Sequence, residues 1–475
     1  MSAFSYTALR SCNVAASCYD QMMVDFEALL REAPFGDDQR TARALVLLGH
    51  LVKGDAVATA GTPRLGDDAP WAHTVGAFRF WNNPHITLPA LYAPCRIALA
   101  QVIPRGARCY VAHDFSPLDF STHHAKRDRV QVGNELGLGY DLYSALVLDQ
   151  EGRPRGPLLQ EVRCDQGVWS SEADTPLPFV DHLGQAERGL AAVRRDLPGR
   201  DVVNVYDREF DDIALQREIH SGAERYIIRA QHLRRSVLHA DARSTLDAAT
   251  AATALVHVGT LDVRTPQGEV THDLWLGETS VVFDGASWRG RHRAGFKTQP
   301  GAPLTVRVVI AELRAPGRKT LRWVLLTNLA DEAIAIVRAY YWRWRIERLF
   351  FFVKVGFRLE SWRQESGAAI ARRLALTSLA AMALYQLEAV ADGDSNDART
   401  ANDTRKWVAT RGGWLGRKGD SLGPIVLMRG MLLVVGALTL IETEGLDVLL
   451  AHVTALRRFL GGTIPDFEAK LRSAV

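Results

Sequence analysis

The sequence predicts an α/β fold: a mixed β-sheet core with a β-rich insertion, flanked by N- and C-terminal helical domains. Three observations predict it. Apolar residues recur at helical spacing up to about residue 90 and again after about residue 360. Short apolar runs bounded by Gly, Pro and Asp begin near residue 105 and alternate with helical segments, which is typical of a mixed α/β layer. Alternating β-type segments with basic loops then fill about 232–320, and we interpret them as an insertion.

Length and composition are those of a multidomain globular protein. The chain has 475 residues, 47% hydrophobic and 23% charged, which are ordinary values for globular domains. The net charge of +3 is too small to indicate a nucleic-acid partner by itself. Five scattered cysteines without a C-x-x-C motif argue against a disulfide framework or a zinc site, and they favour the cytoplasm. The apolar run 431–441 is too short to cross a bilayer, so we expect no membrane partner.

We place the N-terminal helical domain at residues 1–90, with predicted helices at 20–32, 40–53 and 72–81. Arg40 and Arg43 are three residues apart and therefore share one helix face, and Arg79 lies on the last of these helices. We expect this domain to dock on DNA through these arginines. Ordinary solvated arginines are an equally good interpretation of the same pattern.

The core domain, 91–390, contains two acidic residues at strand ends. Its predicted strands are 108–114, 143–149, 158–164, 201–207 and 225–229, with helices at 186–195 and 213–221. Asp114 and Asp207 each stand where a predicted strand stops. Sites in open α/β sheets gather at such ends, although a lone Asp there is more often a turn or cap residue.

A helix predicted at 340–354 carries a third carboxylate on a narrow polar stripe. At about 100° per residue, Tyr340, Arg343, Glu347 and Lys354 share an arc of about 60°, beside an apolar stripe. Such a pattern is usually a solvated, salt-bridged face. Taken together with the two strand-end aspartates, it predicts a metal site, because three carboxylates cannot all ionise close together without a cation. Mg²⁺ is the expected ion, with Arg343 and Lys354 on phosphate oxygens.

Two further regions suggest partners. The loop 288–297 places Trp288 beside four cations, which suits a phosphate backbone and an unstacked base, or simply a solvated loop. The C-terminal domain, 391–475, follows a polar linker and contains apolar helices at 428–440 and 446–460. Spare apolar surface there would suit a homodimer.

The pattern Tyr340-x2-Arg343-x3-Glu347-x6-Lys354 resembles the signature helix of cut-and-paste transposases of the insertion sequence 4 family. Asp207, in Tyr-Asp-Arg-Glu-Phe-Asp, is similar to that family's second catalytic carboxylate. Asp114, in Ala-His-Asp-Phe-Ser-Pro-Leu, is similar to the first. The resemblance runs from about residue 35 to about 390.

This resemblance implies a ribonuclease-H-like core and further DNA-binding residues. Trp323 would take up a flipped base, Arg229 would lie at the active site, and Arg208 follows the second Asp. The segments around Arg40, Arg43 and Arg79 resemble the family's end-binding helical domain. At Phe350-Phe351-Phe352 the chain departs from the family, which has a more polar stretch there.

The implied function is a DDE transposase acting on double-stranded DNA at the nucleoid in the bacterial cytoplasm. Asp114, Asp207 and Glu347 would hold two Mg²⁺ ions, with Mn²⁺ as a substitute, for cleavage of transposon ends through a hairpin and strand transfer into target DNA. A homodimer would form the synaptic complex. Two alternatives remain: a catalytically inactive DNA-binding regulator and a tyrosine recombinase using Tyr340. A glycosidase also uses paired carboxylates, but the arginine and lysine stripe beside Glu347 would have no role in it.

Overall fold

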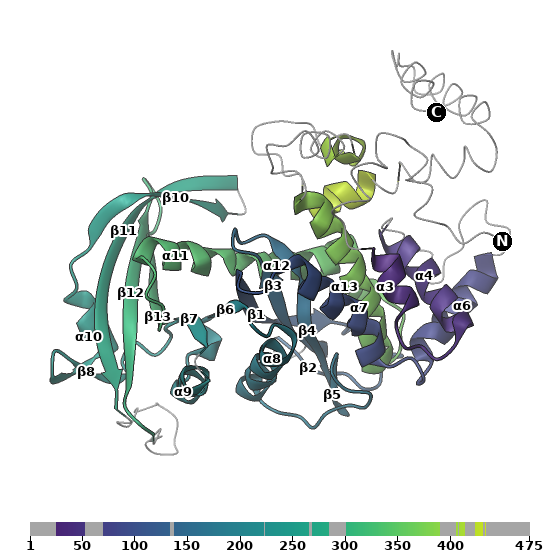
Figure 1. Cartoon of the computed structure of the whole chain (residues 1–475), viewed down its shortest axis with the longest axis horizontal. Coiled ribbons are helices and arrows are strands. Elements are labelled where there is room, and N and C mark those ends of the chain that lie inside the picture. Colours follow the sequence, from purple (N-terminus) through teal and green to yellow (C-terminus); the bar gives the residue numbers. More distant parts are fainter. Residues whose placement is uncertain are drawn as a thin grey trace, which may run out of the picture.

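The computed structural model describes residues 25–52, 70–133, 137–222, 224–265, 268–284 and 301–389, with short pieces at 405–406, 408–413, 423–430 and 433. The loop 288–297 and nearly all of the predicted C-terminal domain lie outside the described residues. Figure 1 shows the remainder as a row, with the β-rich insertion on the left, the sheet core in the middle and the N-terminal helices on the right.

The core sheet has the predicted order of elements. The strands are β1 (Arg108–Asp119), β3 (Leu138–Leu148), β4 (Pro154–Cys164), β6 (Asp201–Tyr206) and β7 (Arg225–Arg229), with α8 (His182–Asp196) before β6 and α9 (Ile213–Ser221) before β7. Strands β4, β3 and β1 are antiparallel neighbours, whereas β1, β6 and β7 run parallel. The prediction of a mixed α/β layer is therefore confirmed. Two short strands, β2 (Val130–Gln131) and β5 (Gly167–Ser170), pair with β3 and β4.

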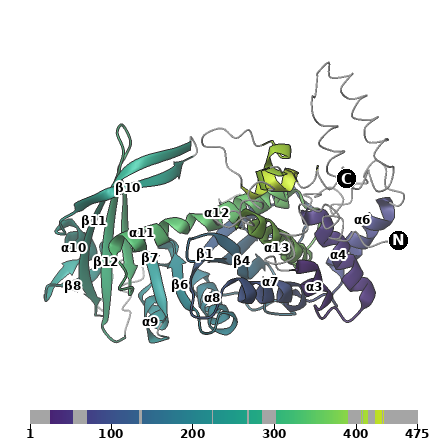
Figure 2. The same ribbon diagram turned by 45° about the horizontal axis from the view of Figure 1, so that its top comes forward.

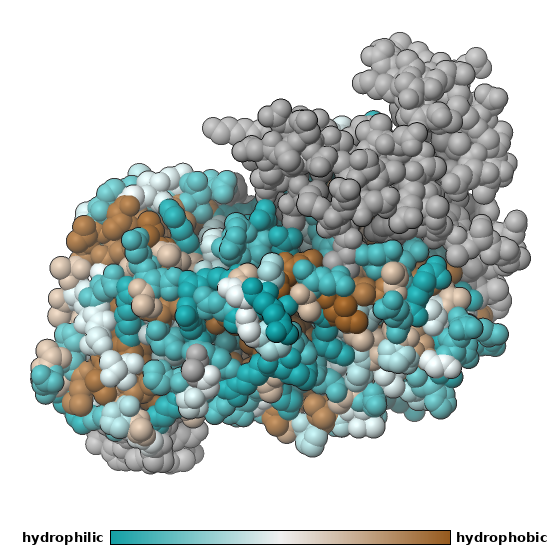
Figure 3. Space-filling model, in the orientation of Figure 1, coloured by the Kyte–Doolittle hydropathy of each residue, from teal (hydrophilic) through white to brown (hydrophobic). Residues whose placement is uncertain are grey.

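The insertion extends this same sheet. Strand β13 (Leu321–Thr327) pairs with β7 on one side and with β12 (Leu304–Arg314) on the other. The remaining elements are β8 (Ser236–His239), β9 (Ala242–Thr245), α10 (Leu246–Ala251), β10 (Val256–Thr265) and β11 (Gly268–Phe283). Over the described ranges the core and insertion form one 13-stranded sheet. Strand β10 pairs only with β11 in this sheet and exposes Val256 and Val258. Figure 3 shows apolar patches over the insertion within a mixed surface.

The N-terminal helices pack on a long helix that follows the core. They are α3 (Phe26–Arg31), α4 (Asp38–Val52), α6 (Pro70–Asn82) and α7 (Leu88–Val102). Helix α13 (Gly367–Ala389) contacts α4, α6, α7 and β4. Its buried Arg372 donates to the carbonyl oxygens of Trp81 and Ile86. Helices and sheet thus share one hydrophobic core, and α7 crosses residue 90, where the sequence predicted a boundary.

Within α13, the segment Gly367–Gln386 is long and apolar enough to cross a membrane, by length and composition alone. It is 94% buried inside the protein, however, and a core helix of a globular protein passes the same test. Its apolar character is explained here by packing between the sheet and the N-terminal helices.

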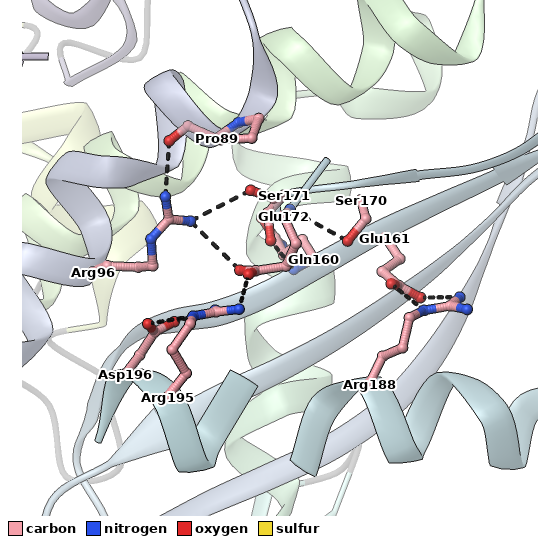
Figure 4. Close-up of polar contacts among 10 residues, drawn as sticks. All are labelled: Pro89, Arg96, Gln160, Glu161, Ser170, Ser171, Glu172, Arg188, Arg195 and Asp196. Atoms are coloured by element: carbon pink, nitrogen blue, oxygen red, sulfur yellow. Dashed lines mark hydrogen bonds and ion pairs between the residues drawn. The ribbon is translucent and has the colours of Figure 1, made fainter. Parts of the chain in front are cut away.

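A network of ion pairs ties α7 and α8 to the sheet (Figure 4). The Arg188 guanidinium on α8 donates Nε and Nη2 to the two oxygens of Glu161 on β4, at 2.7 and 2.8 Å. Glu172, just after β5, accepts ion pairs from Arg96 on α7 and Arg195 on α8. Consecutive residues of β4 point to opposite faces of the sheet, and Gln160 accepts from Tyr92 on α7 whereas Glu161 faces α8, so the two helices lie on opposite faces.

The predicted 340–354 helix is interrupted. Helix α11 (Ala333–Trp342) ends at Arg343, α12 (Trp344–Phe351) follows, and a π-helical turn covers Phe352–Gly356. Figure 2 shows α11 and α12 nearly in line, running from the insertion across the core. The wider π turn changes the rotation per residue, so side chains after Phe351 leave the stripe that a regular helix predicts.

Candidate metal and nucleic-acid site

Two of the three predicted carboxylates project from adjacent parallel strands. The ladder between β1 and β6 ends at the pair His113 and Tyr206. Asp114 follows His113 and Asp207 follows Tyr206, so both aspartates stand at the same edge of the sheet. Strand β1 continues to Asp119 on its β3 side, which the sequence did not predict. Asp114 therefore marks the end of the parallel pairing, not the end of the strand.

The third carboxylate reaches the same place from α12, and one guanidinium joins all three. Arg343 Nη1 lies 2.8 Å from Asp114 Oδ2. Arg343 Nη2 lies 2.6 Å from Glu347 Oε1 and 3.5 Å from Asp207 Oδ2. We call these four residues the Arg343 cluster. The structure thus brings together side chains from β1, the end of β6 and α12.

The exposed fraction of the side chains increases across the cluster from Arg343 to Glu347. The Arg343 side chain is 10% exposed, Asp114 16%, Asp207 23% and Glu347 45%. Burial raises the pKa of Asp114 to about 6; Arg343 opposes this rise, and Asp207 and Glu347 add to it. Burial would lower the pKa of Arg343, but Tyr340 and the three carboxylates raise it, so the guanidinium stays charged.

The charges in the cluster do not balance. One guanidinium against three ionised carboxylates leaves a formal charge of 1 − 3 = −2. Carboxylate oxygens are the ligands that hard divalent cations such as Mg²⁺ prefer, and an excess of negative charge favours their binding. Asp114, Asp207 and Glu347 therefore offer the type of ligand that such an ion prefers, with the Arg343 guanidinium lying between them.

The residue before Asp114, His113, belongs to a buried polar group that the sequence did not indicate. His113 is fully buried, with Nδ1 2.7 Å from the Tyr143 hydroxyl and Nε2 3.0 Å from Asn204 Oδ1. Burial lowers the pKa of His113 to about 4, so the ring is neutral. Because Asn204 Oδ1 only accepts, Nε2 carries the proton and the Tyr143 hydroxyl donates to Nδ1. The one available signal was a polar His within an apolar strand.

Tyr340, Trp323 and Arg229 form one wall beside the cluster. The Tyr340 and Trp323 rings lie 5.2 Å apart between centroids, edge to face. Tyr340 is buried, and burial raises its pKa, while Arg343 and Arg229 lower it. Trp323 is half-buried on β13. Tyr340 therefore lies next to the carboxylates, and Trp323 and Arg229 lie beside Tyr340.

Lys354 lies elsewhere. Its Nζ donates to the Pro117 carbonyl at 2.6 Å and lies 3.5 Å from Glu360. It belongs to the π turn, and this explains why it does not join Glu347 on a common arc. Arg208 is exposed on the 3₁₀ turn Arg208–Phe210, and its backbone N–H donates to Asp207.

The three N-terminal arginines have different surroundings. Arg40 donates to the Phe35 carbonyl at 2.9 Å and pairs weakly with Asp37. The Arg43 guanidinium lies against Gly76, where an added Cβ would meet its Cζ at 2.6 Å. Arg79 is the exposed member of the three. A glycine at position 76 therefore lets α4 and α6 approach closely around Arg43.

A second acidic group is structural. Asp128, Cys164 and Asp165 offer ligand atoms within 4.8 Å of one another. Both Asp128 oxygens already accept hydrogen bonds, from the Tyr140 hydroxyl at 2.5 Å and from the Gly367 N–H at 2.7 Å. Burial raises the pKa of Cys164 to about 11, so it remains a thiol. Asp128 therefore holds the first residue of α13 in place.

No known family model matches the sequence. Among solved structures, the chain is similar to the piggyBac transposase in a synaptic complex with hairpin DNA. The TM-score is 0.36 with 10% identity, over 95% of this chain and 83% of that one.

Proposed function

We propose that this chain is a DDE transposase, a metal-dependent nuclease and strand transferase of the insertion sequence 4 type. The observation that carries the proposal is the Arg343 cluster. Three carboxylates from distant parts of the chain meet at one edge of the sheet with an excess of negative charge. The signature helix and the motifs around both aspartates support the assignment to this family.

The proposed core is ribonuclease-H-like, and it comprises the path β4-β3-β1-β6-β7. What supports it is the order of three antiparallel strands followed by two parallel strands, each preceded by a helix. The site then lies where the parallel ladder ends, which is the usual place for a site in a sheet of this kind.

In the proposed reaction, Asp114, Asp207 and Glu347 hold divalent ions, Mg²⁺ or in its place Mn²⁺. When bound, such ions would activate a water or a DNA 3′-hydroxyl for attack and would stabilise the charge on the leaving oxygen. The chain's own residues would position the DNA strand. Arg208, exposed beside Asp207, would contact the DNA backbone, and Arg229, next to Tyr340, would lie beside the cut together with that tyrosine. Trp323 would stack on a base expelled at the hairpin.

The wider assignment follows from the same proposal. The N-terminal helices would bind transposon ends through Arg40, Arg43 and Arg79, with Lys354 adding a phosphate contact, and target DNA would enter after cleavage. The C-terminal domain would form the homodimer of a synaptic complex. Such an enzyme would work at the bacterial nucleoid, in the cytoplasm.

The tyrosine recombinase alternative is disfavoured by Tyr340 itself. Its side chain is buried against Trp323, and burial raises its pKa, so the phenol is a poor nucleophile. An inactive regulator would bind the same DNA without cleaving it, so an assay of DNA cleavage distinguishes it from the proposed enzyme.

The test is nicking of a duplex that carries the inverted repeats flanking the gene, in Mg²⁺ and in EDTA. Glu347→Gln should keep DNA binding in a gel-shift assay and lose nicking. Glu278→Gln is the matched control, because Glu278 is 46% exposed and pairs with Arg307 at 2.6 Å, outside the Arg343 cluster. Nicking by Glu347→Gln, or cleavage in EDTA with a covalent protein–DNA adduct, would overturn the proposal.

A further inference from the structure

Arg343 contacts the oxygens that a metal ion would need. Asp114 Oδ1 accepts the Phe115 N–H at 2.9 Å, and Asp207 Oδ1 accepts the Arg208 N–H. In each aspartate, Oδ1 therefore accepts from the N–H of the following residue, and Oδ2 faces Arg343. Glu347 likewise presents Oε1 to the same guanidinium.

A guanidinium and a divalent ion cannot occupy this place together. The Arg343 nitrogens lie 2.6 to 3.5 Å from the three carboxylates, so the guanidinium fills the space between them. A hard cation binds carboxylate oxygens at about 2.0–2.6 Å. It would displace the Arg343 nitrogens, and the positive charges would repel each other at that range.

We propose that Arg343 is a positioning residue that holds the three carboxylates together in the metal-free protein and leaves them when a divalent ion binds. The guanidinium is thus a built-in competitor of the metal. This inference rests on the proposed function, because it takes Asp114, Asp207 and Glu347 as the metal ligands.

The competition predicts tighter metal binding when the guanidinium is removed. An opposite charge beside a carboxylate favours its ionised form by about ten- to a thousandfold, and a metal must overcome the same attraction. We take the low end of that range and expect Arg343→Gln to bind Mn²⁺ about tenfold more tightly than the wild type. Arg343→Lys keeps a cation and should stay near the wild-type affinity.

The measurement is a titration of the full chain with Mn²⁺ in the absence of DNA, in which electron paramagnetic resonance reports the concentration of free Mn²⁺. Glu347→Gln reports whether binding occurs at the cluster. Arg243→Gln is the control, because Arg243 pairs with Asp284 on the insertion, away from the cluster. Its Mn²⁺ affinity should equal that of the wild type.

Thermal unfolding provides a second readout. A difference in melting temperature that depends on metal is expected for the competition and not for a purely structural role. Without metal, Arg343→Gln should melt below the wild type, because three carboxylates then repel one another. Saturating Mn²⁺ should remove most of that difference. A structural arginine would lower the melting temperature equally in both conditions.

The outcomes separate the two claims. If Glu347→Gln weakens Mn²⁺ binding but Arg343→Gln leaves it unchanged or weaker, the competition is wrong and the metal site stands. If Glu347→Gln binds Mn²⁺ as the wild type does, or neither binds it, the metal site is wrong and the competition with it.

Discussion

Two groups of charged side chains in this protein differ in one respect that separates scaffold from site. In the network of Figure 4, the three guanidinium groups of Arg96, Arg188 and Arg195 meet three carboxylates, so the formal charge is 3 − 3 = 0. These carboxylates belong to Glu161, Glu172 and Asp196. The Arg343 cluster carries −2 with a single guanidinium.

The difference in formal charge indicates where a ligand is expected. A buried ion pair whose charges cancel needs nothing further, and it serves to fix α7 and α8 against the sheet. A cluster with unbalanced charge lowers stability until a cation arrives, which is typical of functional sites. Both groups contain arginines and carboxylates, so residue type alone does not distinguish them.

The largest expected effect is on cleavage. Asp207→Asn should lower DNA nicking in Mg²⁺ by about a thousandfold, because a metal ligand contributes several kcal/mol to the transition state. Its melting temperature without metal should stay level or rise, since one of three repelling charges is gone. Glu172→Gln, in the balanced network, should do the reverse and lower the melting temperature while nicking persists. If both variants lose only stability, the comparison is wrong.

The next effect concerns the balanced network. Arg188→Met leaves the fully buried Glu161 without its bidentate partner, which should cost about 3–5 kcal/mol in the free energy of unfolding by urea. Replacing Glu161 as well, as Glu161→Leu with Arg188→Met, should recover most of that loss. No recovery in the double variant would show that the pair does not act as a unit.

A third effect is the pH dependence of the metal-free protein. The pKa of Asp114 rises in the folded state from 3.8 to about 6, so the folded protein binds this proton more tightly than the unfolded chain. Ionising Asp114 therefore lowers stability as pH rises, by about 3 kcal/mol for about two pKa units. Asp114→Asn should gain on the wild type as pH rises from about 4 to above about 6. A constant difference in unfolding free energy across that range would contradict the assignment.

The smallest effect lies beside the cluster. Trp323→Ala should weaken binding of an unpaired base by about tenfold, since base stacking contributes about 1–3 kcal/mol. Fluorescence of 2-aminopurine placed at the cut end reports the unstacked base. Trp275→Ala, which removes a tryptophan that contacts His257 and Arg314 on the insertion, is the control and should leave the signal unchanged.

The sequence predicts the local elements well and their pairing less well. Apolar runs and turn residues are local signals, and for this reason the order from β1 to β7 was predictable. The pairing of β13 with β7 joins residues about a hundred positions apart, and no local pattern specifies it. The sequence therefore predicted a β-rich insertion but not that its strands continue the core sheet.

The site shows the same limit. Strand ends and helical spacing predicted which residues stand near one another, including Asp114, Asp207 and Glu347. They did not predict that Arg343 contacts carboxylates, because spacing identifies a shared face but not its partners. Lys354 was misplaced because the π turn at Phe352–Gly356 has no simple sequence signature. His113 and Asn204 meet only through the pairing of β1 and β6.

The position of α12 along the chain affects the order in which the site is made. A ribosome synthesises β1 and β6 early, and their aspartates can become neighbours as soon as those two strands pair. The third acid emerges only after the whole insertion has been translated. A product of interrupted translation that ends between residues 207 and 342 carries Asp114 and Asp207 but neither Arg343 nor Glu347. Incomplete chains in the cell thus lack the full set of groups at this site.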